Sequence, residues 1–338
     1  MAELLSAHTT LRIGGPAAEF VEATDERALV AAVADADRRG LPVLVLAGGS
    51  NVLVADEGFD GRVVAVRTSG TDADVDGCGG AMVRVAAGEP WDPFVARAVD
   101  SGWVGIEALS GIPGSVGATP IQNVGAYGQE VAQTLASVRC WDRAGGEMRT
   151  FAAADCAFGY RTSRFKEEPG RHLVLEVTFQ LRLGDLCAPV AYAELARTLG
   201  VEVGGRVPTA RVREAVLGLR RGKGMVLDDA DHDTWSAGSF FTNPLLDPGA
   251  VPDGAPVWPQ PDGRVKTSAA WLIDHAGFGK GYGEGRAGLS RKHPLALTNR
   301  GGATAADLLA LAREVRDGVR ARFGVELVNE PVLVGCSL

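Results

Sequence analysis

The chain has 338 residues, of which 46% are hydrophobic and 22% are charged; this composition is typical of a globular protein and excludes extended disorder. A formal net charge of −8 gives no general attraction to nucleic acid or to an anionic membrane surface, so we expect neither as a partner. Any anionic ligand must therefore be bound by a local cluster of basic side chains and backbone N–H groups.

The N-terminus and the cysteines favour a cytoplasmic protein. The segment MAELLSAHTT has no basic region followed by an apolar core, so we expect no secretory signal. No apolar run approaches the roughly 18 residues that a membrane helix requires. The five cysteines are widely spaced and form no C-x-x-C pair, so we expect reduced, mostly buried thiols and no metal site.

The hydrophobic pattern predicts helices and strands along the whole chain. Helices are predicted, in chain order, at 24–39, 90–100, 208–221, 269–275 and 304–322. Strands are predicted at 43–47, 52–54, 62–66, 82–86, 136–141, 148–151, 172–183 and 325–334. Thr24 is expected to cap the first helix, and Thr304 with Asp307 forms a capping box at the start of the last one.

A first pattern that indicates a ligand separates the two strands predicted at 43–47 and 52–54. It consists of four turn-forming residues, Gly48, Gly49, Ser50 and Asn51. Glycine adopts positive φ angles, and successive N–H groups in such a turn form a concavity that suits a diphosphate. A tight connection without a ligand explains the same residues equally well. The spacing is not the G-x-G-x-x-G of the Rossmann fold, so a nucleotide-like cofactor here requires a different scaffold.

A second pattern is the glycine-rich, almost uncharged stretch at 106–128, IEALSGIPGSVGATPIQNVGAYG. An exposed loop of this length usually carries more charge, so the composition favours close wrapping of an aromatic ligand over plain buried turns. Uncharged hydrogen-bonding groups for a ring and a polyol chain would come from Ser110, Ser115, Thr119, Gln122 and Asn123.

Two basic clusters remain open to two interpretations. The segment 158–166, FGYRTSRFK, is either a solvated turn or an anion-binding site, and Arg220, Arg221 and Lys223 either bind an anion or complement a helix dipole. Ser239 lies in SAGSFFTNP, which lacks the G-x-S-x-G frame of a hydrolase nucleophile, so we expect no hydrolytic triad.

Taken together, these segments resemble the UDP-N-acetylmuramate dehydrogenases, also called UDP-N-acetylenolpyruvoylglucosamine reductases (the MurB family). The matching segments are TTLRIGGPA at 9–17, LAGGSNVLV at 46–54, GIPGSVGATPIQNVGAYG at 111–128, FGYRTSRFK at 158–166, AGSFFTNP at 237–244, AAWLIDHAG at 269–277, GLSRKHPLALTN at 288–299 and FGVELVNEPVLVG at 323–335. They follow the order of the family and cover nearly the whole chain.

The resemblance implies an α+β flavoprotein with the FAD-binding fold of the vanillyl-alcohol-oxidase/PCMH type and a C-terminal α/β substrate-binding domain. The implied parts are an FAD-binding subdomain at 1–68 with 323–338, a second at 69–205, and a substrate domain at 206–322. It further implies that NADPH reduces FAD, and that the enolpyruvyl ether of UDP-N-acetylglucosamine is then reduced to UDP-N-acetylmuramate for peptidoglycan synthesis. We expect a monomer in the cytoplasm.

Three catalytic residues are assigned by the resemblance. Arg161 would hold a carboxylate with its planar fork, because the negative charge that develops beside this carboxylate requires fixed donors. Glu330 would be a second donor, which requires its protonated form in an apolar environment. Ser239 would deliver a proton to carbon.

The resemblance also assigns binding residues. The FAD diphosphate would lie against Gly48, Gly49, Ser50 and Asn51, and the isoalloxazine against Ser115, Gly117, Thr119 and Gly125. The substrate would contact Tyr192, Lys223 and Asn243, with Tyr192 marking the longer form of the family, in which a tyrosine-bearing loop closes over the nucleotide.

One residue departs from the family pattern. Many members carry Lys or Arg after the Phe240–Phe241 pair, whereas this chain has Thr242, so the basic cluster at 220–223 is expected to matter more. Two other functions remain open on the sequence: an FAD-dependent alcohol oxidase or dehydrogenase of the same superfamily, and a flavin-binding protein without catalysis.

Overall fold

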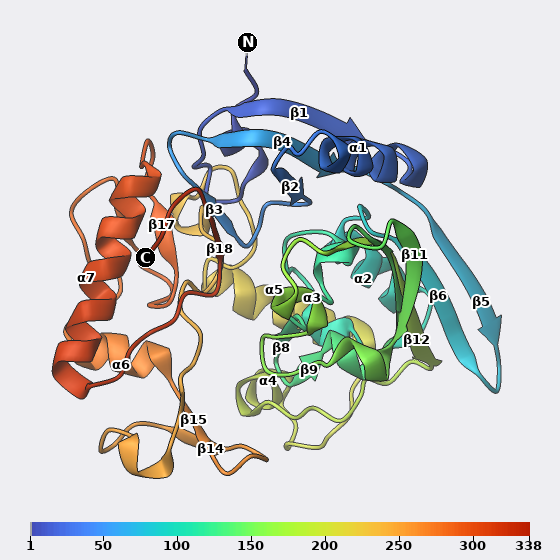
Figure 1. Ribbon diagram of the computed structural model, residues 1–338. Helices are drawn as coiled ribbons and strands as arrows, with labels where there is room; N and C mark the ends of the chain where they lie inside the picture. Colours follow the sequence, from blue (N-terminus) through green and yellow to red (C-terminus); the bar gives the residue numbers. More distant parts are fainter. Residues whose placement is uncertain (1) are drawn as a thin grey trace. The chain divides into compact units, whose positions relative to one another are not determined.

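The computed structural model describes residues 2–338 (Figure 1). The contacts among these residues divide the chain into two units. Unit 1 contains the residues up to Ala17 together with Gly49–Phe59 and Gly222–Leu338, and unit 2 contains Ala18–Gly48 and Asp60–Arg221. The sequence analysis divides the chain differently, into two FAD-binding subdomains and a substrate domain. That functional division stays a prediction.

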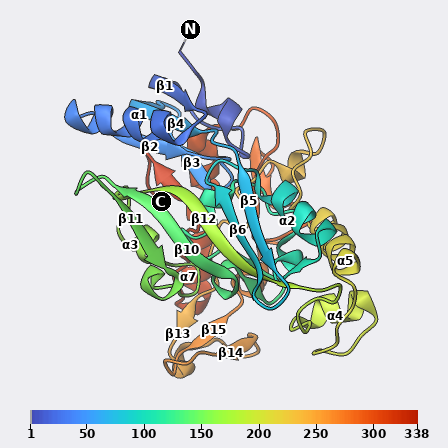
Figure 2. The same ribbon diagram turned by 90° about the vertical axis from the view of Figure 1, so that its right-hand side faces the viewer.

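The main sheet of unit 2 is antiparallel and has the strand order β11-β10-β12-β6-β5, with β7 paired to β12. Figure 2 shows the labelled strands of this sheet side by side. Their bounds are β5 Thr71–Asp76, β6 Gly80–Ala86, β7 Trp103–Val104, β10 Leu135–Asp142, β11 Glu147–Ala152 and β12 His172–Leu183.

One face of this sheet forms the core of unit 2. In β12, the alternating residues Val177, Phe179 and Leu181 are buried, as the period of a strand requires. The helix α2 (Trp91–Asp100) packs on this face, and the ring centroids of Trp91 and Phe94 lie 5.9 and 5.3 Å from that of Phe179. Burial of these three large rings is a major favourable contribution to the folding of the unit.

A smaller sheet has the order β1-β4-β2, with β1 Ala17–Ala23, β2 Val43–Leu46 and β4 Phe59–Val66, and α1 (Glu26–Arg38) lies between β1 and β2 in the chain. The prediction that Thr24 caps α1 is wrong. Asp25 is the N-cap residue, and its carboxylate accepts a hydrogen bond from the N–H of Ala28 at 2.8 Å. Asp is as good an N-cap residue as Thr. Asp25, which follows Thr24, has the extended backbone that an N-cap residue requires.

Unit 1 contains α6 (Ala269–His275), α7 (Ala305–Phe323) and three small sheets, in the orders β18-β3, β16-β17 and β13-β15-β14. The strands are β3 Val52–Val54, β13 Leu245–Leu246, β14 Val257–Pro259, β15 Val265–Thr267, β16 Ala287–Leu289, β17 Leu297–Asn299 and β18 Val332–Val334. The capping box of Thr304 and Asp307 at the start of α7 is confirmed, and Gly324 ends the helix with φ +69°. The strand predicted at 325–334 is shorter, because Pro331 has no N–H for a ladder and only β18 pairs regularly.

The remaining helices and strands of unit 2 are short, except for α5. They are β8 Gly125–Ala126, β9 Gln129–Glu130, α3 Arg164–Glu167, α4 Ala193–Leu199 and α5 Thr209–Gly222. Single 3-10 turns occur at Leu5–His8, Glu107–Leu109, Val116–Ala118, Val131–Gln133, Ala153–Cys156, His232–Thr234 and Pro248–Ala250. Three of the five cysteines are buried, as expected. Within residues 2–338, no helix combines the length and apolar character needed to cross a bilayer.

Candidate functional site

At both glycines of the Gly-Gly-Ser-Asn turn, neighbouring backbone leaves no room for a side chain. A Cβ on Gly49, whose φ is +58°, would lie 1.9 Å from the carbonyl oxygen of His8, within unit 1. A Cβ on Gly48 would lie 2.6 Å from the Cα of Gly114, within unit 2. The sequence predicts a close approach of this turn to a ligand, and the structure shows that the turn also lies close to the protein's own backbone. A side chain at either glycine would push that backbone away.

In unit 1 the turn residue Asn51 lies beside Glu330. The side-chain amide of Asn51 donates to the backbone carbonyl of Glu330 at 3.4 Å. The backbone carbonyl of Asn51 accepts a hydrogen bond from the N–H of Val332 at 3.0 Å. The N–H of Glu330 in turn donates to the carbonyl of Phe240 at 2.8 Å, directly after Ser239 in the chain. Unit 1 thus brings together three segments predicted for the site: the turn, the segment of Glu330 and the segment of Ser239.

The segment of Ser239 is fixed by the two aromatic residues that follow it. Phe240 and Phe241 are each 1% exposed, and their rings meet edge to face with centroids 5.2 Å apart. Gly238 precedes Ser239 with φ +73°, so the chain turns into the buried pair. Ser239 itself is half-buried. Its backbone is therefore anchored on one side by core packing, which suits a residue that must hold a hydroxyl in place.

A residue that the sequence analysis did not assign, Thr10, connects these segments. It is buried, and its hydroxyl donates to the carbonyl of Ser236 at 2.7 Å while its N–H donates to the carbonyl of Gly49 at 3.0 Å. Thr10 therefore connects the glycine turn to the segment 236–238, which leads to Ser239. The only signal for it in the sequence is its place in the family segment TTLRIGGPA.

In unit 2, the hydroxyl of Ser115 is buried and has no hydrogen-bond partner among the described residues. Three other polar side chains of the glycine-rich stretch are used internally: the hydroxyls of Ser110 and Thr119 donate to the carbonyls of Glu107 and Val116, and the amide of Asn123 donates to the carbonyl of Gly159. A buried polar atom without a protein partner is costly and rare. Ser115 therefore fits a polar atom of a bound cofactor.

Arg161 lies against the β8 strand that ends the glycine-rich stretch. Its guanidinium donates to the carbonyl of Gly125 at 2.8 Å and to that of Asn123 at 3.4 Å. Its own φ is +54°, a value that is uncommon for residues other than glycine and that occurs often at functional sites. The structure thus brings together two predicted residues, Arg161 and Gly125.

Tyr192 directly precedes α4 and packs edge to face on Tyr127, with ring centroids 5.6 Å apart. Tyr192 is 47% exposed. Tyr127 also faces Arg220 near the end of α5. Burial lowers the pKa of Arg220 to about 10, and electrostatic interactions with Tyr127 and Asp92 partly offset this effect, so the guanidinium is still charged at neutral pH.

The last two predicted substrate residues, Lys223 and Asn243, lie in unit 1. Lys223 is half-buried and follows α5 directly in the chain. The carboxamide oxygen of Asn243 accepts from the N–H of Ala269 at 3.0 Å, at the first residue of α6. Asn243 therefore also has a structural role at the start of this helix.

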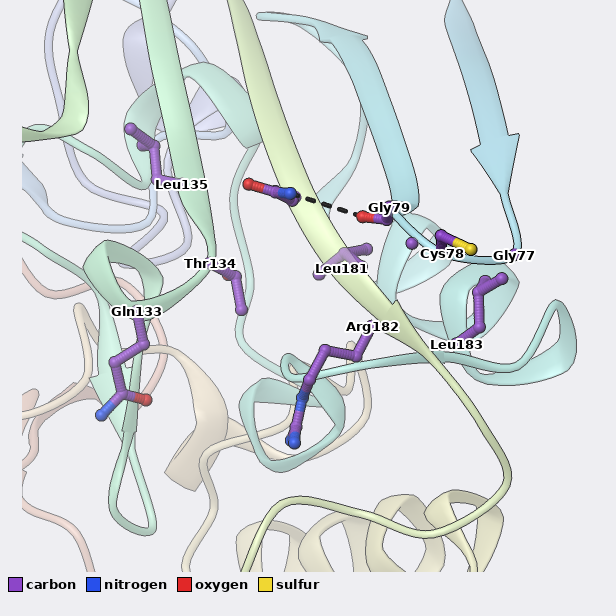
Figure 3. A pocket seen from close by; sticks show the side chains of 11 residues that line it. Gly77, Cys78, Gly79, Gln133, Thr134, Leu135, Leu181, Arg182 and Leu183 are labelled. Carbon is purple, nitrogen blue, oxygen red and sulfur yellow. Dashed lines mark hydrogen bonds between the residues drawn. The ribbon is translucent and has the colours of Figure 1, made fainter.

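A surface cavity of about 460 Å³ in unit 2 contains none of the predicted site residues. Figure 3 shows its lining residues, which come from the segments 77–80, 133–135 and 180–183. The hydrogen bond drawn there runs from the side-chain amide of Gln180 to the carbonyl of Gly79, at 3.4 Å. Because none of the predicted site residues lines it, this cavity is not part of the candidate site.

Comparison with known proteins identifies the family. Residues 229–334 match the model of the UDP-N-acetylenolpyruvoylglucosamine reductase C-terminal domain, and residues 17–152 match the model of an FAD-binding domain. The UDP-N-acetylenolpyruvoylglucosamine reductase of Cutibacterium acnes is 62% identical to this chain over 337 residues, which are 99% of this chain and 90% of that protein. The chain belongs to the UDP-N-acetylenolpyruvoylglucosamine reductase family.

Two further relatives agree with this assignment. The reductase of Thermobifida fusca is 58% identical over 99% of this chain and 97% of its own length. The crystal structure of the Thermus caldophilus reductase matches with a TM-score of 0.70 and 28% identity, over 99% of this chain and 98% of that one. The fold, the flavoprotein class and FAD as cofactor, which the sequence predicts, are therefore confirmed.

Proposed function

We propose that this chain reduces the enolpyruvyl group of UDP-N-acetylglucosamine-enolpyruvate to the lactyl ether of UDP-N-acetylmuramate, with NADPH as reductant, in the synthesis of peptidoglycan precursors. The observation that carries the proposal is the identity of 62% to a reductase of this name over nearly the full chain. The same observation favours this reaction over an alcohol oxidase and over a flavin-binding protein without catalysis.

The proposed cofactor site combines the two ligand patterns of the sequence. The turn residues Gly48, Gly49, Ser50 and Asn51 bind the FAD diphosphate through backbone N–H groups. The isoalloxazine lies against Ser115, Gly117, Thr119 and Gly125. The buried hydroxyl of Ser115 supports this assignment, because a ligand atom would satisfy it. When bound, FAD supplies the transfer of a hydride equivalent from NADPH to the vinyl carbon of the substrate.

The protein's own residues manage the charge that this reduction creates. Negative charge develops on the substrate beside its carboxylate, and preorganised donors stabilise such charge most effectively. Arg161 binds the carboxylate, and its contacts with the carbonyls of Gly125 and Asn123 fix the plane of the guanidinium. Glu330, whose backbone is held between Asn51 and Phe240, is the second donor.

Ser239 is the proposed proton donor to carbon. A serine hydroxyl is a weak acid, so it must be held within hydrogen-bond reach of the carbon that it protonates and be re-protonated through a relay. The anchoring of its segment by Phe240 and Phe241 supports this role, because it fixes the backbone that carries the hydroxyl.

The substrate's nucleotide diphosphate is bound by Tyr192, Lys223 and Asn243, with Arg220 and Arg221 supplying further positive charge. Thr242, where many members have a basic residue, has its hydroxyl and its N–H directed to the carbonyl of Val328. Thr242 therefore supports the backbone beside Ser239, and the charge must come from the end of α5.

The division of labour follows the sequence-based boundaries. Residues 1–68 with 323–338 and residues 69–205 form the FAD-binding subdomains, and residues 206–322 form the substrate-binding domain. The substrate contacts proposed for Arg161, Tyr192 and Glu330 come from the FAD-binding subdomains. The protein acts as a monomer in the cytoplasm.

The test follows the flavin absorption of the purified protein without oxygen. NADPH should bleach the yellow protein, and enolpyruvyl-UDP-N-acetylglucosamine should then restore the colour. The matched control is UDP-N-acetylglucosamine, which lacks the vinyl group and should not restore it. A bleached protein that the enolpyruvyl substrate does not reoxidise would refute the proposed function.

A further inference from the structure

The segment that leads into α2, together with the first residues of this helix, supports the first half of the glycine-rich loop of unit 2. The N–H groups of Gly117 and Val116 donate to the carbonyls of Ala87 and Glu89, both at 2.8 Å. Around Trp91, the backbone N–H donates to the carbonyl of Gly114 and the indole N–H to that of Leu109, both at 3.0 Å. The loop proposed to line the isoalloxazine is therefore shaped by the segment 87–92.

Asp92 completes this support from its side chain and also contacts a second element. Its Oδ1 accepts a hydrogen bond from the N–H of Gly111 at 2.6 Å, at the beginning of the loop. The guanidinium of Arg213, on α5, binds both oxygens of the same carboxylate, at 2.6 and 2.9 Å. A bidentate pair of this kind fixes orientation as well as distance. One carboxylate thus joins the flavin loop to α5.

The other end of α5 carries the basic residues proposed for the substrate diphosphate. Arg213 and Arg220 are seven residues apart, which is two helical turns, so both lie on the same side of α5. The negative charge of Asp92 also acts on Arg220. A rotation or slide of α5 would therefore move Arg220 and the following basic residues together.

We propose that Asp92 is a positioning residue that couples the flavin loop to the substrate-binding end of α5 through Arg213. This inference rests on the proposed function, because it assigns the two coupled segments to FAD and to the nucleotide diphosphate. It predicts that loss of the bidentate pair weakens substrate binding while the hydrogen bond to Gly111 keeps the flavin loop in place.

The chain offers a closely matched control pair in the same unit. Arg143 binds both oxygens of Asp37 at 2.6 and 3.1 Å, and donates further to the carbonyl of Gly170. The side chains of Arg143 and Asp37 are 18% and 30% exposed, against 19% and 33% for Arg213 and Asp92. This pair joins α1 to the turn after β10, which contains no proposed site residue.

The experiment compares Arg213→Gln, Asp92→Asn and the control Arg143→Gln as holoenzymes, at saturating NADPH. We expect Arg213→Gln and Asp92→Asn to raise KM for the enolpyruvyl substrate about tenfold, with kcat and the flavin spectrum unchanged. Arg143→Gln should leave KM unchanged. Because the two changes remove one interaction, the double variant should be no worse than either single variant. Asp92→Ala, which also removes the contact with Gly111, should in addition shift the flavin absorption bands.

Equal KM values for Arg213→Gln and Arg143→Gln would overturn the inference, and so would additive effects in the double variant. Loss of FAD in Arg213→Gln would overturn it too, because it would show that the pair only maintains the fold. The wild-type enzyme separates the two hypotheses: if the substrate does not reoxidise it, the proposed function fails. If the substrate does reoxidise it and the variants match the control, only the coupling fails.

Discussion

At the scale of single residues, the proposed site depends on backbone as much as on side chains. Arg161, Asn123 and Tyr127 all have positive φ angles near +50°, although none of them is glycine. Such conformations cost about 1–3 kcal/mol each and persist where the surroundings enforce them. Here the hydrogen bonds from the guanidinium of Arg161 to the carbonyls of Asn123 and Gly125 help to hold these backbone conformations.

Arg161→Lys should lower kcat/KM for the enolpyruvyl substrate at least about tenfold. An ammonium group cannot bind a carboxylate in the bidentate geometry while it also contacts two carbonyls. Steady-state kinetics measures the effect. Arg164→Lys is the control from the same segment, because Arg164 donates instead to the carbonyl of Asp155. Turnover of Arg161→Lys near the wild-type level would remove Arg161 from the site.

Ser239→Ala should slow the reoxidation of the reduced enzyme by the substrate by a factor on the order of 10²–10⁴, because that half-reaction needs a proton delivered to carbon. Reduction by NADPH should stay near the wild-type rate, since it needs no such proton. Stopped-flow absorption separates the two half-reactions. Equal damage to both half-reactions would contradict the role of Ser239 as proton donor.

At the scale of elements, turns and helix ends are held by specific polar groups. Asp142, the buried last residue of β10, accepts hydrogen bonds from the guanidinium of Arg171 and from the N–H groups of Ala144 and Gly145. Hydrogen bonds from Arg171 lower the pKa of Asp142 to about 2, against the opposing effect of burial, and the two N–H groups of the turn add to the lowering.

The pH dependence of stability follows from this shift. Because the pKa of Asp142 is lower in the folded state, the ionised carboxylate stabilises the fold above about pH 4, and this contribution is lost as the pH falls towards 2. Asp142→Asn should therefore lower the free energy of unfolding at pH 7 and have little effect near pH 2. Chemical denaturation at both pH values measures this, with the exposed Asp155→Asn as control. A constant difference across the pH range would contradict the interpretation.

At the scale of the whole molecule, each unit is assembled from distant parts of the chain. Unit 1 joins the N-terminal segment, the residues 49–59 and the C-terminal third, so the turn at Asn51 and the segment of Glu330 meet across 279 positions. Contacts between residues so far apart in the chain cost loop-closure entropy, which must be lost before the contacts can stabilise the fold. A cofactor that binds the folded chain adds stability on top of these contacts.

Removal of FAD should therefore lower the melting temperature, and added FAD should restore it in a concentration-dependent way. At a free FAD concentration of about 100 times Kd, the gain is about 2.7 kcal/mol. Thermal melting of the apoprotein during an FAD titration measures the effect, with adenosine monophosphate as the control ligand. A melting temperature that does not depend on FAD would argue against the proposed cofactor site.

Much of the fold follows from local sequence signals. Hydrophobic period and capping residues act over a few positions, so the helices α5, α6 and α7 and the capping box at Thr304 were predictable. The error at Thr24 arose because two adjacent residues were both good caps, and only the backbone conformation of Asp25 decides between them. The family was predictable because its segments occur in order along the whole chain.

By itself, the sequence determined the long helices, most of the longer strands, the family and the chemical types of the candidate site residues, because these depend on short patterns. Only the tertiary structure decided that β2 and β3, which are separated by the five residues 47–51, belong to different sheets, since their partners β4 and β18 are set by long-range packing. It also decided that Asn123 is used internally whereas Ser115 is not. A polar side chain can bind a ligand only if no distant segment of the chain already occupies its hydrogen-bonding groups. The periodicity of hydrophobic residues in the sequence carries no information about such contacts.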